Sequence, residues 1–266
     1  MSSNHYNKLD NLYTKTEIDT LIENSGSSGN SGDYGPEYFI NYEEIYLGDH
    51  VTEEQSANIA NGSFNGLPLG AYWTINNINY RIMARDIYYA TGELQYRDVV
   101  NHHVVVMPDT ITYSTLYDAK NNYGGYVNSN LRSYVEDTYN PYITSIFGDN
   151  HILSHTHDLA AGSVSGRANT KAWLINSYNV DGQKYQYENN YSWKPSDKLQ
   201  FPAFKGNTSL KIAKQGSSVT SWWLGTAITV GSSSDMFSVV NSSGEVYYGF
   251  IGVGYARGIR PAFLVY

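Results

Sequence analysis

Residues 25–35 have the sequence Ser-Gly-Ser-Ser-Gly-Asn-Ser-Gly-Asp-Tyr-Gly and contain no aliphatic side chain. A segment of this composition contributes almost nothing to a hydrophobic core and behaves as a flexible linker. The chain must therefore fold on either side of it, as a short part at residues 1–24 and a larger domain at residues 36–266.

The short part is predicted to contain one helix. The sequence Thr-Lys-Thr-Glu at residues 14–17 is a capping box, and Ile18, Leu21 and Ile22 then form one apolar stripe. A helix shorter than about 12–15 residues is marginal by itself in water. We expect it to oligomerise with copies of itself through this stripe, and docking on its own domain is the alternative.

Residues 36–266 are predicted to form one α+β domain with mixed short strands and two or three helices. A capping box, Thr-Glu-Glu-Gln at residues 52–55, begins a helix that should end near Gly62. Apolar runs flank an Asn-Asn turn at residues 76–77 and predict a hairpin. The valine-rich run at residues 103–107 predicts a strand.

The rest of this domain alternates helix and strand signals. Ser129 should begin a helix, and Asn140 and Pro141 supply the N-cap and first residue of another, which ends at Gly148. The last third of the chain contains short strands joined by Ser-Gly turns. Its apolar end, residues 261–266, predicts an inner strand.

The composition limits the classes of function. Lys and Arg number 17 against 25 Asp and Glu, so the net charge is −8 and we expect no nucleic-acid binding. The absence of cysteine removes thiol catalysis, disulfides and Cys-based metal sites. No apolar run approaches the ~20 residues that span a bilayer, and residues 1–10 lack the pattern of a signal peptide. We expect no membrane insertion, and synthesis in the cytoplasm without classical export.

One cluster of histidines has metal-ligand chemistry. His155 and His157 would point to the same face of a strand, close to His151, but no fourth ligand is defined. These three histidines are metal candidates, and we favour the interpretation that they pair with backbone groups. The pair His102-His103 is interpreted in the same way. We therefore expect no metal and no cofactor.

No catalytic motif is present: the sequence lacks Gly-x-Ser-x-Gly, P-loop and His-Glu-x-x-His patterns. Glu43-Glu44 and Glu53-Glu54 are adjacent carboxylates that face apart, so neither is by itself a glycosidase pair. We expect no enzymatic activity. A depolymerase stays open as the alternative, because glycosidase carboxylates meet in space and not in sequence.

Tyrosine occurs 26 times and offers a rigid ring with a polar tip, which suits binding surfaces. We expect most of these tyrosines to be half-buried core. Of Trp222 and Trp223, one ring should enter the core and the other should face the surface, because alternate strand residues point to opposite faces. The candidates for a receptor surface are Tyr185, Tyr187, Tyr191, Trp193, Trp223, Tyr247 and Tyr248.

Arg260 and Trp222 are interpreted as structural residues. Arg260 lies in the sequence Gly-Ile-Arg-Pro-Ala-Phe at residues 258–263, between apolar residues that alternate toward a core. An arginine persists in such a place when it is paired or hydrogen-bonded.

Several motifs resemble those of a known family. Ser-Trp-Trp-Leu-Gly at residues 221–225, Phe-Ser-Val-Val at residues 237–240 and the closing run at residues 258–263 look like the C-terminal signature of an unassigned-function domain family in Firmicutes and their phages. That family resembles the C-type-lectin-like fold of formylglycine-generating enzymes and phage tropism determinants. Residues 67–75 resemble phage structural proteins, and residues 11–19 resemble the helical connector of phage fibres.

The resemblance implies a bacteriophage tail fibre or head fibre protein located in the virion. Its N-terminus would be an anchor that contacts other virion proteins, it would form a homotrimer, and a C-type-lectin-like head at residues 36–266 would bind a host-surface glycan or protein for attachment. A capsid decoration that binds glycans or mucus, and a fibre-borne glycan depolymerase, are the alternatives. Formylglycine-generating enzymes use cysteines, and calcium-dependent lectins use Glu-Pro-Asn and Trp-Asn-Asp motifs; this sequence has neither, so neither activity is implied.

We expect replacement of Ile18 and Leu21 by aspartate to abolish the oligomer of the full chain. Burial of each apolar side chain contributes ~1.5–3 kcal/mol, and one helix cannot bury its stripe alone whereas three can. Light scattering should give the mass of a trimer for the unmodified chain and of a monomer for the double variant. Monomers in both samples at high concentration would contradict the prediction.

Overall fold

The computed structural model describes residues 42–89, 99–111, 126, 129–161, 164–183, 185, 198–230, 233–247 and 257–266. The chain divides into two units, Met1–Phe39 and Ile40–Tyr266, and every described residue belongs to the second. The predicted helix and linker at residues 1–35 lie outside the described residues.

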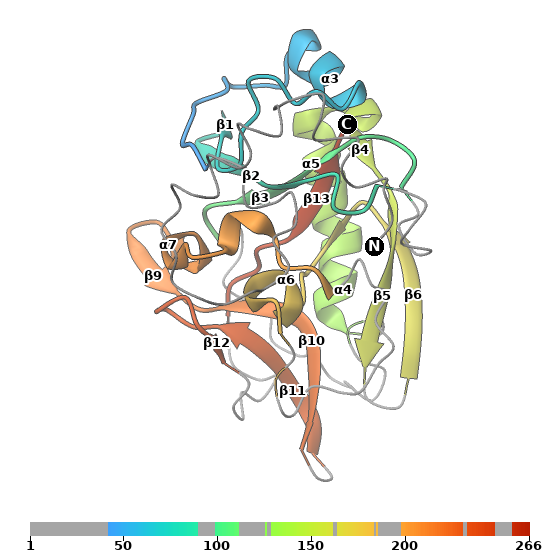
Figure 1. Cartoon of the computed structure of the whole chain (residues 1–266). Coiled ribbons are helices and arrows are strands. Elements are labelled where there is room, and N and C mark those ends of the chain that lie inside the picture. The colour runs from blue at the N-terminus through green and yellow to red at the C-terminus, as the bar shows by residue number, and fades with distance from the viewer. Residues whose placement is uncertain are drawn as a thin grey trace, which may run out of the picture. The chain divides into compact units, whose positions relative to one another are not determined.

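A six-stranded antiparallel sheet forms the centre of the second unit (Figure 1). Its order is β1 (Tyr72–Ile75), β2 (Ile78–Arg85), β3 (Val104–Pro108), β13 (Ala262–Val265) and β4 (Ile152–Leu153), with β7 (Ala172–Trp173) also paired to β13. The last strand of the chain therefore lies between β3 on one side and β4 and β7 on the other. This confirms the inner strand predicted for the apolar end of the chain.

The hairpin of β1 and β2 carries the edge of this sheet. Its turn residues Asn76 and Asn77 have φ values of 51° and 62°, a conformation that asparagine tolerates and that suits two-residue hairpin turns. The hairpin prediction is therefore confirmed. An extended segment runs parallel along the outer edge of β1, with bridges from Tyr42 to Leu69 and from Tyr46 to Tyr72.

Both faces of the central sheet are buried. Val104 and Val106 of β3 belong to one hydrophobic cluster, whereas Val105 and Met107 belong to another on the opposite face. A strand covered on both faces needs apolar residues at every position, which explains the unbroken valine run.

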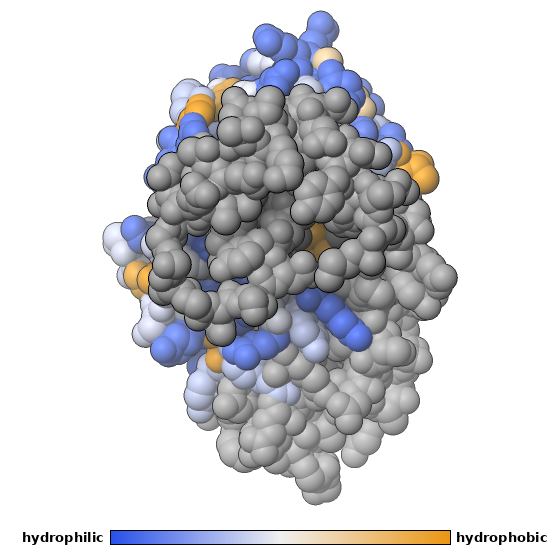
Figure 2. Space-filling view, viewed as in Figure 1, coloured by the Kyte–Doolittle hydropathy of each residue, from blue (hydrophilic) through white to orange (hydrophobic). Residues whose placement is uncertain are grey.

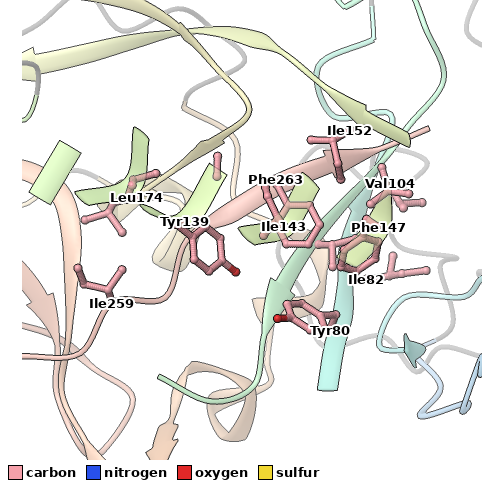
Figure 3. Close-up of a cluster of buried hydrophobic side chains, with 14 of the residues drawn as sticks. Tyr80, Ile82, Val104, Tyr139, Ile143, Phe147, Ile152, Leu174, Ile259 and Phe263 are labelled. Carbon is pink, nitrogen blue, oxygen red and sulfur yellow. The ribbon is translucent and has the colours of Figure 1, made fainter. Parts of the chain in front are cut away.

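Helices cover the first face. They are α3 (Glu53–Ala60), α4 (Asn130–Tyr134), the π-helix η4 (Val135–Tyr139) and α5 (Asn140–Phe147), followed by the 3-10 turn η5 (Asp149–His151). Figure 3 shows Tyr139, Ile143 and Phe147 from this layer beside Tyr80 and Phe263 of the sheet. The predicted capping box at residues 52–55 is confirmed at the start of α3, and Ser129 caps α4 as expected.

Shorter elements cover the second face, and the remaining strands form small sheets. The helices are α6 (Ser177–Asp181), η7 (Pro202–Phe204) and α7 (Thr208–Lys211). The strands are β10 (Trp222–Val230), β11 (Ser233–Val240) and β12 (Val246–Tyr247) in one sheet, β5 (His155–Ala161) with β6 (Val164–Thr170), and β8 (Ala213–Gln215) with β9 (Ser218–Thr220). The predicted α+β class is confirmed. In the part of the chain described here, no helix is both long and apolar enough to cross a bilayer.

Asn140 is not the N-cap of a separate helix, contrary to the prediction from the Asn-Pro pair. α4, η4 and α5 form one continuous helical stretch, and Asn140 has helical φ and ψ within it. The wider π-helical turn precedes Pro141, which has no N–H to donate, and the Asn140 N–H reaches the carbonyl of Val135. A proline therefore lies within the helical stretch without ending it.

Trp223 is not at the surface, so the prediction that it forms part of a receptor surface is wrong. Trp222 and Trp223 do point to opposite faces of β10, and each belongs to a different hydrophobic cluster. Only 1 % of Trp223 is exposed, because both faces of this strand are covered. Alternation along the strand correctly predicts that the two rings point to opposite faces, but it does not show that both faces are covered.

We expect Asn140→Ala to lower the free energy of unfolding by about 1–3 kcal/mol. Its side chain donates to Glu136 Oε2 at 2.7 Å and accepts from the buried Ala172 amide at 2.8 Å, so truncation leaves that amide without its acceptor. Urea unfolding measures the change. Ser145→Ala, at an exposed position of the same helix, is the control and should change stability by less than about 0.5 kcal/mol. Equal stabilities of the two variants would contradict the bridging role.

Candidate functional site

The histidines predicted as metal candidates do not meet at one point among the described side chains. His151 lies near the Ser56 hydroxyl (3.3 Å) and the Tyr266 carbonyl (3.4 Å). His155 is buried and packs on the ring of Tyr88, with centroids 4.3 Å apart. The side chain of His157 lies outside the description. Within the described residues, no group of three or more His, Asp or Glu side chains could hold a metal ion.

The predicted receptor residues are placed differently from one another. Tyr247 in β12 is 48 % exposed, whereas Tyr185 is partly buried, hydrogen-bonds Asp181 and packs against the second hydrophobic cluster. Tyr187, Tyr191, Trp193 and Tyr248, and the oligomerisation residues Ile18, Leu21 and Ile22, lie outside the described residues. Tyr247 is thus the one predicted receptor residue that the described part of the chain places at the surface.

Arg260 is completely buried and makes three kinds of contact. Its Nε donates to the Pro108 carbonyl at 2.6 Å and its Nη1 to the Leu210 carbonyl at 2.7 Å. Its guanidinium lies 5.3 Å from the centre of the Trp222 ring, and its Nη2 is 3.9 Å from Asp109 Oδ1. Burial is the largest influence on its protonation and lowers the pKa of Arg260 to about 10.

Asp109 also holds a second arginine, Arg81. Arg81 Nε and Nη2 donate to the two oxygens of Asp109 at 3.0 and 2.6 Å, a bidentate pair, and Nη1 donates to the Gly70 carbonyl at 2.6 Å. The Arg81 side chain is 7 % exposed. Burial alone would lower the pKa of Arg81, but the hydrogen bonds and charge of Asp109 hold it above its ordinary value.

Glu44 lies on the solvent side of Arg81. Its Oε1 is 3.3 Å from Arg81 Nη1 and accepts from the Tyr42 hydroxyl at 2.9 Å, while 60 % of the side chain is exposed. Burial, followed by the hydrogen bond to Glu44, raises the pKa of Tyr42 to about 12. Tyr42 therefore stays a protonated donor to Glu44 at any physiological pH.

Two tyrosine rings complete this part of the surface. Tyr46 is 57 % exposed, and its ring centre is 5.9 Å from that of Tyr72. The Arg81 guanidinium lies over the Tyr72 ring at 5.0 Å. Tyr42 and Glu44 both contact Arg81, whose guanidinium also lies over Tyr72, so these side chains lie close together. We call Tyr42, Glu44, Tyr46 and Tyr72 together the β1-edge face.

The β1-edge face combines an exposed ring with a fixed carboxylate. Such a combination can bind a ligand that has both apolar C–H groups and hydroxyls. The aromatic ring packs against the C–H groups, and the carboxylate accepts hydrogen bonds from the hydroxyls. Besides Tyr46, the exposed large apolar side chains of the described residues are Ile45, in the same segment, and Val100, Val219 and Tyr247. Figure 2 shows one side of the molecule, on which the described residues are mostly hydrophilic with small separate hydrophobic patches.

A second polar cluster joins two loops through Asp86. Its φ of 51° is uncommon for a residue other than glycine. Asp86 Oδ2 accepts from His102 Nδ1 at 2.6 Å, Oδ1 accepts from the His103 amide at 2.9 Å, and the Tyr89 ring stacks on His102 at 4.2 Å. His103 contacts backbone groups, the Tyr88 amide and the Asn101 carbonyl, in agreement with its interpretation. His102 hydrogen-bonds the Asp86 carboxylate instead. The cluster thereby joins the residue after β2 to the residues before β3.

Sequence reasoning named Glu44 only as part of an adjacent carboxylate pair, and it missed the three tyrosines of the β1-edge face and the pair of Arg81 and Asp109 behind it. The alternation Tyr-x-Glu-x-Tyr at residues 42–46 is a local signal that could have found the exposed segment. Arg81 and Asp109 have no such signal, because they are 28 residues apart and meet through strand pairing.

The comparisons with known proteins bear on the C-terminal part of the chain. A family described as a domain of unknown function, DUF6273, matches residues 101–266, which is more than half of the chain. No curated protein matches the chain. No solved structure matches it either. The matched residues include Asp109 and Arg260, whereas the β1-edge face and Arg81 precede the match.

Arg260→Ala should lower the free energy of unfolding by about 3–5 kcal/mol, with a matching fall in melting temperature, because two buried carbonyls and Asp109 lose a partner. Calorimetry and urea unfolding measure the loss. Lys171→Ala, which removes the exposed ion pair with Asp149, is the control and should cost less than about 1 kcal/mol. An unchanged melting temperature would contradict this structural role.

Proposed function

The chain belongs to the DUF6273 family, and we propose that it is a structural virion fibre protein of a bacteriophage whose domain at residues 36–266 binds the host surface. The sequence resemblance supports the virion context, since residues 11–19 resemble a fibre connector and residues 221–225 and 258–263 resemble the C-terminal signature. An α+β domain built on an antiparallel sheet is compatible with the C-type-lectin-like fold that the resemblance implies. Homotrimerisation and attachment to other virion proteins through residues 1–24 are parts of the same proposal.

One observation carries the binding role: exposed Tyr46 and Glu44 lie on a segment that is hydrogen-bonded to the central sheet. The segment that carries them is bonded to β1, with Tyr72 N donating to the Ile45 carbonyl at 2.9 Å. Behind it, Arg81 joins Glu44 to Asp109 within the fold. A binding residue held in place before the ligand arrives loses less conformational entropy on binding.

A fibre-borne depolymerase is the second candidate, because Glu44 and Asp109 both contact Arg81 and so lie near each other. A glycosidase needs one carboxyl that carries a proton to the leaving group. Both oxygens of Asp109 accept from Arg81, and Glu44 Oε1 lies 3.3 Å from the same guanidinium, so each carboxylate already pairs with a cation and neither is placed as a proton donor. The geometry therefore favours binding over hydrolysis. A capsid fibre that binds glycans or mucus uses the same binding chemistry at another place in the virion.

The full chain should sediment with cells from a panel of Firmicutes and should release no reducing sugar from them. Sedimentation followed by a reducing-sugar assay of the supernatant measures both. The β1-edge face presents an exposed ring and carboxylate for contact, which is the reason for expecting binding. Release of reducing sugar would favour the depolymerase, and absence of binding to every strain of the panel would contradict the attachment role.

A further inference from the structure

Tyr46, which is exposed, and Tyr72, which is half-buried, form an apolar platform on the β1-edge face. Tyr46 and Tyr72 lie 5.9 Å apart at an interplanar angle of 47°, so together they form a shallow bent surface and not a closed slot. No hydrogen bond occupies either hydroxyl within the described residues. The electron-rich face of an aromatic ring attracts the weakly positive hydrogens of C–H groups. One side of a pyranose ring presents such C–H groups in a plane.

The carboxylate of Glu44 is fixed beside this platform. Its Oε1 is held by Tyr42 and Arg81, and among the described residues Oε2 has no hydrogen-bond partner. An ionised carboxylate is an acceptor without a donor of its own, so its free oxygen suits the O–H groups at the rim of a sugar. A ligand with a C–H face and hydroxyl groups at its edge matches both features at once.

The charges around the face select against a charged ligand. Arg81 and Arg260 are buried and already paired, whereas Glu44 and Asp109 are the partly exposed charges, so solvent faces the negative groups. A ligand phosphate or uronate would meet these carboxylates without a free cation. A ligand cation is also disfavoured, because both carboxylates already pair with arginine. Arg81 also covers one face of the Tyr72 ring.

We infer that the β1-edge face binds neutral hexose units of a host-surface polysaccharide, with the pyranose stacked on Tyr46 and its hydroxyls donating to Glu44. The inference rests on the proposed function, and it adds the ligand class and the binding residues. It differs from the receptor surface predicted from sequence, of which Tyr247 is the described exposed member.

The ligand class is tested on the full chain by ligand-observed NMR. The probes are the methyl glycosides of glucose, galactose and mannose, with glucuronate as the anionic and glucosamine as the cationic counterpart. At least one neutral glycoside should bind with a dissociation constant on the order of 1 mM, as suits a small ligand at an open site. Saturation transfer should be strongest at the hydrogens of one sugar face. Binding of glucuronate or glucosamine without any neutral sugar would overturn the ligand class.

Matched tyrosine variants test the location. Tyr46→Ala should weaken sugar binding by about tenfold or more with an unchanged melting temperature, because its ring is exposed. Tyr46→Phe should retain binding, and Glu44→Gln should weaken it. Tyr247→Ala removes another exposed ring, which is 48 % exposed against 57 % for Tyr46, and should have no effect. Loss of binding in Tyr247→Ala, or full binding in Tyr46→Ala, would overturn the assignment.

Cell sedimentation with the same variants separates this inference from the proposed function. If Tyr46→Ala still binds cells and no sugar binds, the inference fails and the attachment role stands. If Tyr46→Ala loses cell binding but no probe sugar gives a signal, the ligand class is overturned. If the full chain binds no cells while a neutral glycoside binds at Tyr46, the attachment role fails and the sugar site stands.

Discussion

Asp109 lies between two arginines that the fold has taken out of water. Removing a cation from water costs several kcal/mol, and that cost is offset when hydrogen bonds and an opposite charge are well placed. Arg81 is compensated by both oxygens of Asp109 and the Gly70 carbonyl, and Arg260 by the carbonyls of Pro108 and Leu210. Gly70 precedes β1, Pro108 ends β3 and Leu210 lies in α7. The two guanidiniums therefore hold three separate segments of the chain together. The geometry of the surface above them depends on this arrangement.

The same packing explains two of the sequence motifs on which the family resemblance depends. Residues 221–225 and 258–263 are far apart in the chain but hydrogen-bonded to each other: Trp223 N donates to Gly258 O and Gly258 N to Ser221 O, both at 2.9 Å. A methyl group at Gly258 would lie 2.1 Å from Ile111, and one at Gly225 would lie 2.5 Å from the Leu174 carbonyl oxygen. Both glycines are therefore required by close approach of neighbouring groups. Trp222 and Trp223 belong to different hydrophobic clusters.

The sequence was informative where structure is local. The capping residues Thr52 and Ser129 and the Asn76-Asn77 turn are satisfied within three or four residues of chain, so their patterns identify them directly. Asn140 also has a local cap signature, but the bonds to Glu136 and to the Ala172 amide keep it inside a helix. The prediction that Trp223 is at the surface fails for a related reason, because alternation gives the direction of a side chain but not what covers it. The pairing of Arg81 with Asp109 depends on β2–β3 register, which neither residue encodes alone.

The residues of the proposed binding face precede the part of the chain that matches the family. Asp109 and Arg260 lie within the residues that match the family, whereas Tyr42, Glu44 and Tyr46 precede it on a segment bonded to the edge of β1. Exposed side chains on that segment can change at little cost in stability, because surface substitutions usually alter it by less than about 0.5 kcal/mol. A change at Arg260 instead leaves buried groups without partners. Under the proposed binding role, recognition of a new surface ligand can evolve on the segment before β1 while Asp109 and Arg260 keep the packing beneath it unchanged.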